Sequence, residues 1–190
     1  RAQGASGPCP PVAQAPTAAQ ARSAEQSARD RGFLWRATRN GRVSWLYGTM
    51  HLGRPDWLAL GPTVRRALTS TDTLALELDL TDPAILQAVG AAMATGPGAP
   101  PLPPALEERL ARQVAAACMP AQALQGQHPV IRAVTLMVLD ARWDGLDPAF
   151  AQELALADAA RAARLPVQSL ETVAQQMAAL LPADPAQALE

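Results

Sequence analysis

The sequence predicts an α/β protein in which helices pack around a mixed sheet that opens with an antiparallel hairpin. Three observations predict this class. Two aromatic and β-branched runs flank the dipeptide Asn40-Gly41, short apolar runs recur at residues 73–80 and 165–171, and helix-like segments separate these runs. A length of 190 residues fits one domain with a substantial core better than two.

Residues 1–31 contain no aromatic residue and are rich in Ala, Gln, Pro and Ser, which is typical of a mobile leader. A short helix from Thr17 as N-cap to Gly32 beyond its end fits within this stretch. The chain begins with Arg1 rather than Met, which agrees with removal of an export signal, although a cloning choice would look the same. We therefore expect an exported leader over residues 1–31 and the α/β domain over residues 32–190.

The first strands are expected at residues 33–38 and 43–47. Asn40 and Gly41 both tolerate a positive φ, and they are a strong signal for a two-residue hairpin turn. The second strand leads directly to His51, and ligands of open α/β sheets gather at the carboxyl ends of strands. This position favours a chemical role for His51.

Two glycines flank this histidine at positions 48 and 53, where the missing β-carbon lets the backbone turn and another group approach. His51 could be a metal ligand or a general base. The alternative is a turn histidine bonded to the backbone. Gly48 is counted as a supporting residue, and His128, beside Pro129 at a helix start, is interpreted as structural.

The apolar spacing predicts helices along the rest of the chain. Residues 131–139 are apolar nearly all round, so we expect an interior helix there, and residues 95–104 are an exposed Pro- and Gly-rich connector. The expected helices cover 62–70, with Val64, Ala67 and Leu68 inward, 82–93, a segment from 105, a segment from 129, 149–164 and a segment from 172.

Residues 73–80 alternate as a strand with leucines on one face and two carboxylates, Glu77 and Asp79, on the other. Both carboxylates could bind a metal, position a water or hold His51 in one tautomer. The alternative is a solvated strand end or a helix cap, and Asp79 has that explanation more readily. A free carboxylate one step deeper in an apolar run is costly, so Glu77 is the preferred candidate.

Two further acidic residues are candidates for the same sheet edge. Asp147 precedes Pro148 at a helix start, where N-capping explains it more simply, and it is kept as a supporting residue. Glu171 ends a strand before a helix, so it could reach the crevice at the carboxyl edge or simply lie at the helix N-terminus.

Composition excludes several functions. The net charge of −1 gives no electrostatic case for nucleic acid, and no apolar run reaches the roughly 20 residues of a membrane span. A Gly-rich phosphate loop, a G-x-S-x-G elbow and an H-E-x-x-H pair are all missing from the sequence.

Cys9 and Cys118 could pair in an oxidising compartment, or Cys118 could be merely a small apolar group on a helix.

Five motifs follow one another along the chain: Gly32-Phe33-Leu34-Trp35-Arg36, Leu46-Tyr47-Gly48-Thr49-Met50-His51, Ala75-Leu76-Glu77-Leu78-Asp79, Gly145-Leu146-Asp147 and Leu170-Glu171-Thr172-Val173-Ala174-Gln175-Gln176. Their order resembles the TraB/PrgY/GumN family, which includes the Tiki proteases and has an erythromycin-esterase-like architecture. The exported bacterial GumN-type branch is most similar, because its leader often carries a Cys-Pro-Pro such as Cys9-Pro10-Pro11. This resemblance implies a periplasmic or extracellular protein.

The resemblance also implies a metal-dependent hydrolase, similar to a peptidase, in which a metal-bound water is the nucleophile. Gly48 and His51 match the first of two G-x-x-H motifs, and Glu77 matches the acidic member. We expect His51 and Glu77 to be catalytic and His51, Glu77 and Glu171 to hold a divalent metal (Mn, Co or Zn). The substrate would be a peptide or another hydrolysable ester or amide, and the chain could form oligomers.

A second G-x-x-H motif does not occur in this sequence. We therefore interpret the chain as the first half of such a protein, with a metal site that is short of ligands by itself. The alternative function is a non-catalytic binding or accessory protein of the cell envelope, connected with polysaccharide.

Overall fold

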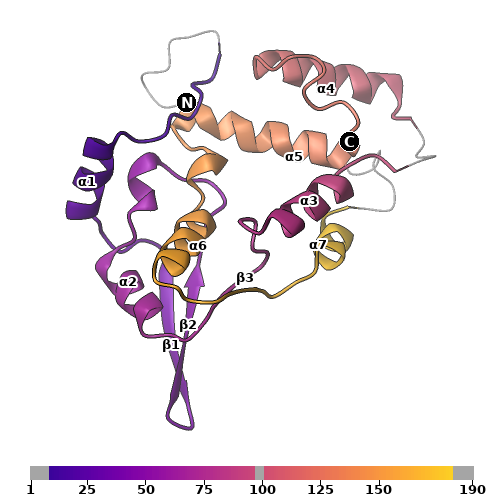
Figure 1. The fold of residues 1–190 in the computed structure, drawn as a ribbon. Coiled ribbons are helices and arrows are strands. Elements are labelled where there is room, and N and C mark those ends of the chain that lie inside the picture. Colours follow the sequence, from indigo (N-terminus) through magenta and orange to yellow (C-terminus); the bar gives the residue numbers. More distant parts are fainter. Residues whose placement is uncertain (1–8, 97–100, 182–190) are drawn as a thin grey trace. The chain divides into compact units, whose positions relative to one another are not determined.

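The computed structural model describes residues 9–96 and 101–181, which form two compact units, each built from separate stretches of the chain. The unit that we call the helical unit consists of residues up to 12, 82–145 and from 171 onward. The unit that we call the hairpin unit consists of residues 13–81 and 146–170. Figure 1 shows the elements of both.

The hairpin unit opens with the predicted antiparallel hairpin, formed by β1 (Phe33–Arg39) and β2 (Arg42–Gly48). Asn40 and Gly41 have φ values of 50° and 74°, as a two-residue type I′ turn requires. The register pairs Phe33 with Gly48, so both strands have the same length. The hairpin prediction is confirmed; β1 is one residue longer than expected at its C-terminal end, and β2 is one residue longer at each end.

A second, parallel pair joins β3 (Leu74–Leu76) to β4 (Val167–Ser169) in the same unit. The expected α/β class is confirmed. In the part of the chain that the structure describes, however, the hairpin and the parallel pair are two separate two-stranded sheets. The strand expected over residues 73–80 is much shorter, because the chain bends at Glu77 and Leu78.

Capping residues and prolines mark the starts of several helices in the hairpin unit. Thr17 caps α1 (Ala18–Gln26) with a full capping box, and α1 ends before the expected Gly32. The short 3-10 helix η1 (Pro55–Leu58) precedes α2 (Pro62–Thr69), which buries Val64, Ala67 and Leu68 as predicted. The helix expected over 149–164 is divided into a 3-10 turn, η3 (Pro148–Phe150), and α6 (Gln152–Ala162).

The helical unit contains α3 (Pro83–Ala92), α4 (Pro104–Ala116), α5 (Pro129–Asp140), the 3-10 helix η2 (Ala141–Asp144) and α7 (Val173–Leu180). Asp82 caps α3 and Thr172 caps α7 in a capping box. The expected connector over 95–104 falls partly outside the described residues. No helix in residues 9–96 and 101–181 is long and apolar enough to cross a membrane.

The core of the helical unit lies between α4 and α5 and consists of Leu110, Val114, Leu124 and Leu136. Arg132 of α5 donates two hydrogen bonds, of 3.0 and 2.6 Å, to the carboxylate of Glu107 on α4. The interior position predicted for α5 is wrong, because Met137 is 69% exposed. One face of α5 packs on α4, and the opposite face is exposed. The apolar sequence of this helix does not distinguish an exposed face from a buried one.

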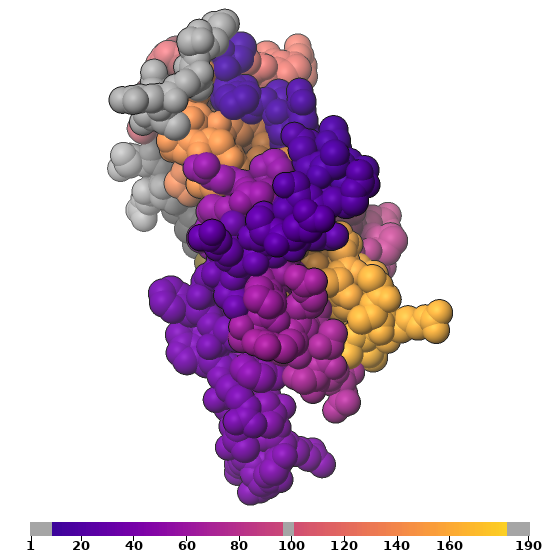
Figure 2. Space-filling view, turned by 90° about the vertical axis from the view of Figure 1, so that its left-hand side faces the viewer, coloured from indigo at the N-terminus to yellow at the C-terminus, as the bar shows by residue number. Residues whose placement is uncertain are grey.

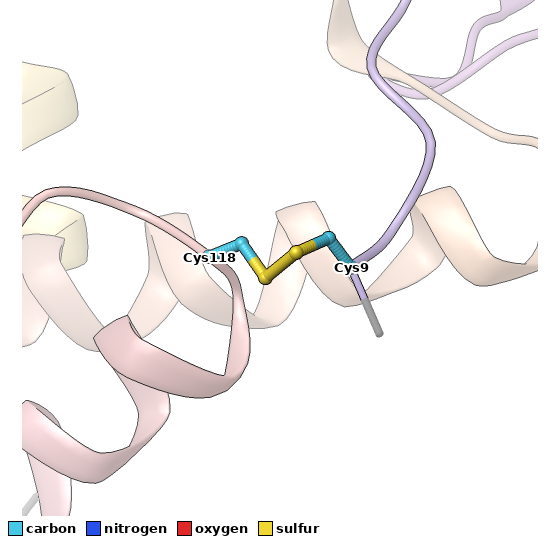
Figure 3. The surroundings of a disulfide bond; sticks show 2 residues. All are labelled: Cys9 and Cys118. Atoms are coloured by element: carbon cyan, nitrogen blue, oxygen red, sulfur yellow. A yellow bond between two sulfur atoms is a disulfide. The ribbon is translucent and has the colours of Figure 1, made fainter. Parts of the chain in front are cut away.

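Cys9 and Cys118 form a disulfide bond within the helical unit (Figure 3). Cys118 follows the C-terminus of α4 and has a φ of 54°, in the left-handed region common just beyond helix ends. The bond ties the N-terminal segment of this unit to the end of α4.

Candidate functional site

The loop that carries His51 is held by the segment that begins α6, within the hairpin unit. Met50 donates its N–H to the side chain of Gln152 at 3.1 Å, and Gln152 donates its own N–H to the carbonyl of Met50 at 3.1 Å. Two further backbone bonds, of 3.1 and 2.9 Å, join Gly53 to Asp147. The loop is therefore fixed on both sides of His51.

Gly53 is required by this close approach. A β-carbon on Gly53 would lie 2.0 Å from the carbonyl oxygen of Phe150, which no side chain tolerates. Gly48 differs, because a β-carbon there would meet only Phe33, at 3.8 Å or more, in ordinary contact. The steric argument that the sequence suggested for both glycines applies to Gly53.

Tyr47 connects the hairpin to the same support. Its hydroxyl donates to the carbonyl of Arg31 at 2.6 Å and accepts a hydrogen bond from Gln152 at 3.3 Å. Burial raises the pKa of Tyr47, and the negative charge of Asp30 raises it further. The phenol therefore stays protonated and anchors Gln152, which in turn holds the loop at Met50.

His51 lies between two carboxylates. Its Nδ1 is 3.1 Å from Oε1 of Glu153, and its Nε2 is 4.0 Å from Oε2 of Glu77. The side chain of His51 is 75% exposed and that of Glu77 is 61% exposed, whereas that of Glu153 is 17% exposed. One ring nitrogen therefore faces a largely buried acid, and the other faces an accessible acid.

Glu153 lies in the first turn of α6. Its Oε1 accepts a hydrogen bond of 2.5 Å from the hydroxyl of Thr49, and its Oε2 is buried with no hydrogen-bond partner among the described residues. An ionised carboxylate can only accept hydrogen bonds, so its position beside Nδ1 favours the tautomer with the proton on Nδ1. This arrangement leaves the lone pair of Nε2 directed to the side of Glu77.

Sequence reasoning missed Glu153. An acidic residue in the first turn of a helix is explained by the helix dipole, so it drew no attention as a site residue. Its distance along the chain from His51 gives no local pattern. The sequence alone offers no signal for it, because the contact of the neighbouring Gln152 with Met50 is seen only in the structure.

The donor types at His51 and Glu77 suit a divalent cation. Ligand distances of zinc to imidazole nitrogen and carboxylate oxygen are about 2.0–2.2 Å each, so in a tetrahedral site the two ligating atoms would lie about 3.4 Å apart. Nε2 of His51 and Oε2 of Glu77, 4.0 Å apart, would share one ion after a small movement of these exposed side chains. A carboxylate on the other ring nitrogen, as Glu153 provides, is the usual outer partner of a metal-binding histidine. Within residues 9–96 and 101–181, however, no group of three or more His, Cys, Asp or Glu side chains could hold a metal.

Glu77 and Asp79 do not share one environment, contrary to the strand alternation. The bend after Leu76 leaves Glu77 exposed, while Asp79 is buried. Asp79 accepts hydrogen bonds from Thr81 and a 2.8 Å hydrogen bond from Arg161. Burial alone would raise the pKa of Asp79, but these bonds outweigh it and lower the pKa. Asp79 is thus a structural anchor between the end of β3 and α6.

The remaining predicted residues have other surroundings. Asp147 is buried and caps η3 by accepting from the N–H of Ala149 at 2.9 Å, and His128 caps α5 through its Nδ1. Glu171 is exposed and belongs to the helical unit.

The helical unit has an open pocket of about 1120 Å³ between α4 and α5, with Pro10, Arg109, Asp140 and Trp143 in its wall. None of the predicted catalytic or metal-binding residues, His51, Glu77 and Glu171, lines this pocket. The pocket and the histidine cluster are therefore two separate features of the protein.

The model of the TraB/PrgY/gumN family matches residues 33–190 of this sequence. The chain belongs to the TraB/PrgY/gumN family. The match begins at the first residue of β1, so in this family member it includes the hairpin and all three residues of the His51 cluster. Neither the curated proteins nor the solved structures gave a significant match.

Proposed function

We propose that this TraB/PrgY/gumN protein is a metal-dependent hydrolase that acts on peptide bonds or on another ester or amide. The observation that carries the proposal is the position of His51 between Glu77 and Glu153. The three residues come from the loop after β2, the bend after β3 and the first turn of α6. Their meeting point is exposed enough at His51 and Glu77 for a substrate to reach it.

Each residue of the cluster has a distinct role in the proposal. Glu153 holds the proton of His51 at Nδ1 and fixes the orientation of the ring. Nε2 of His51 and the carboxylate of Glu77 are the donors for a divalent cation (Mn, Co or Zn), and Glu77 is also the candidate base for a water proton. A divalent cation bound there would lower the pKa of a water toward neutrality.

The direct test is the metal content of the purified protein and of its His51→Ala variant. We expect the protein to bind Mn, Co or Zn, and we expect His51→Ala and Glu77→Gln to lose most of the bound metal and the hydrolysis of a peptide library. His128→Asn is the matched control, because asparagine also caps helices and His128 lies outside the cluster. Unchanged metal content and hydrolysis in His51→Ala would contradict the proposal.

We further propose a periplasmic or extracellular location. The Cys9–Cys118 disulfide supports it, because disulfides form and persist in oxidising compartments. The test is to label free thiols after rapid acid quenching of cells that express the natural gene. Two unlabelled cysteines support export, and two labelled cysteines contradict it.

A further inference from the structure

The hairpin exposes an apolar face near its base. Strand alternation places Phe33, Trp35 and Leu46 on one face, and these side chains are 72%, 54% and 67% exposed. Phe33 and Trp35 stack with ring centroids 5.7 Å apart. The opposite face is the one that meets the rest of the hairpin unit, because Trp45 donates to Ser70 and Tyr47 binds Arg31 and Gln152. Large apolar side chains gathered in one exposed place indicate an interaction surface.

The outer edge of β1 has no strand partner within residues 9–96 and 101–181. The two-residue turn makes Arg39 and Arg42 a hydrogen-bonded pair, so alternation directs the backbone groups of Leu34, Arg36 and Thr38 away from β2. In the described residues the hairpin sheet has only its two strands, and Arg36 and Thr38 are exposed. Figure 2 shows the hairpin, in violet, extending from its unit. Alternating donors and acceptors along an edge are satisfied best by another polypeptide strand.

The charge of the hairpin indicates which kind of polypeptide would bind to the outer edge of β1. Residues 33–48 contain three arginines, at positions 36, 39 and 42, and no acidic residue, although the whole chain has a net charge of −1. Pairing of this edge with the same edge of a second copy would bring arginines close to arginines, which opposes a symmetric dimer. An acidic segment has the opposite charge.

We propose that the outer edge of β1 binds an extended acidic polypeptide as an added β-strand. Its acidic side chains lie beside Arg36 and Arg39, and its apolar side chains pack on Phe33 and Trp35. The register pairs Phe33 with Gly48, three residues before His51 in sequence, so one end of the bound segment approaches the loop of the candidate site. The claim that the bound segment is a substrate rests on the proposed function. The claim that the segment binds to this edge does not.

The test uses a fluorescein-labelled peptide of about eight residues, a normal strand length, with Glu in its first half and alternating Val and Thr in its second half. Fluorescence anisotropy measures its affinity for the whole protein. We expect binding to weaken at least about tenfold in Arg36→Glu/Arg39→Glu, since a like charge then stands opposite each acidic residue. Arg109→Glu/Arg112→Glu on α4 makes the same change in net charge on exposed residues and is expected to bind as the parent does.

A backbone variant tests strand addition itself. Thr38→Pro removes an outward N–H without removing a bond between β1 and β2, so it should lose peptide binding while the Trp fluorescence of the hairpin is retained. Thr38→Val should bind as the parent does. The proposal would be overturned if a peptide with Lys in place of Glu, or one N-methylated at alternate residues, bound equally well. It would also be overturned if the protein formed a dimer that Arg36→Glu/Arg39→Glu dissociates.

The same titration in His51→Ala separates this proposal from the proposed hydrolase. Unchanged peptide affinity with lost metal supports the binding edge and leaves catalysis to be judged by the metal experiment. Hydrolysis without measurable binding at the hairpin overturns the edge proposal and leaves the hydrolase intact.

Discussion

Nδ1 of His51 lies 3.1 Å from Oε1 of Glu153, so an exposed histidine is oriented by a largely buried acid from the first turn of α6. The same carboxylate accepts the hydroxyl of Thr49. Glu153 thereby connects the loop after β2 with α6 and presents Nε2 to Glu77. This relationship explains how a histidine on a loop can keep one ring orientation.

Glu153 should fix the tautomer of His51. We expect ¹⁵N chemical shifts of the neutral ring to report a proton mainly on Nδ1 in the parent protein, and a shift to the Nε2-protonated form in Glu153→Leu, because that variant removes the acceptor. Glu153→Gln keeps an acceptor oxygen and should retain the Nδ1 form. His128 is the internal reference, since its Nδ1 accepts from Val130 and its proton is on Nε2. An unchanged His51 tautomer in Glu153→Leu would show that Glu153 does not determine the position of the ring proton.

Asp79 should contribute stability that depends on acid pH. Its folded-state pKa lies below the ordinary value of 3.8, because the hydrogen bonds from Thr81 and Arg161 outweigh the opposing effect of burial. The contribution is therefore fully present above about pH 4 to 5 and is lost as the pH falls through the lowered pKa. Asp79→Asn should reduce the free energy of unfolding by about 1–3 kcal/mol at pH 7.

Urea unfolding at pH 7 and pH 3 measures this effect. The difference between Asp79→Asn and the parent should be smaller at pH 3 than at pH 7, because below the ordinary pKa of 3.8 the unfolded chain takes up a proton at Asp79 and the advantage of the charged folded form decreases. Asp72→Asn, at an exposed position of the same unit, should change stability by less than about 0.5 kcal/mol at both pH values. A difference for Asp79→Asn that stays constant with pH would show that its charge does not matter.

Gly53→Ala should damage the loop of the candidate site. The new β-carbon would overlap the carbonyl of Phe150, so the bonds to Asp147 must break or shift, at a cost of about 2–4 kcal/mol. Gly90→Ala is the matched control, because nothing lies within 4 Å of the added carbon on α3, and it should stabilise by about 0.5–1 kcal/mol. Thermal unfolding of both variants gives the comparison, and an equal response of the two would refute the steric argument.

Loss of the disulfide should destabilise the helical unit. The two cysteines are 109 residues apart, and the chain-entropy model gives roughly 4–5 kcal/mol for closing a loop of that length. Cys118→Ser should lower the melting temperature, and Cys9→Ser/Cys118→Ser should melt close to it. Dithiothreitol should lower the melting temperature of the parent and leave both variants unchanged. A parent protein that is insensitive to dithiothreitol would contradict a stabilising role.

The sequence by itself determined the features that depend on neighbouring residues. Asn40-Gly41 specified the hairpin because both residues adopt a positive φ, and Thr17, Asp82 and Thr172 specified helix starts because their side chains bind the first free N–H groups. The order of motifs was likewise sufficient for the family. These signals act over a few residues, so they can be recognised without knowledge of the fold.

Only the tertiary structure decided which acidic residues meet His51. Alternation predicted that Glu77 and Asp79 share a face, but β3 ends at Leu76 after pairing with β4, and the bend then exposes Glu77 and buries Asp79 against Arg161. Glu153 reached His51 because Gln152 binds Met50, a contact between distant parts of the chain. Strand ends and distant pairings are set by packing and by the satisfaction of backbone hydrogen bonds, and local sequence does not encode either.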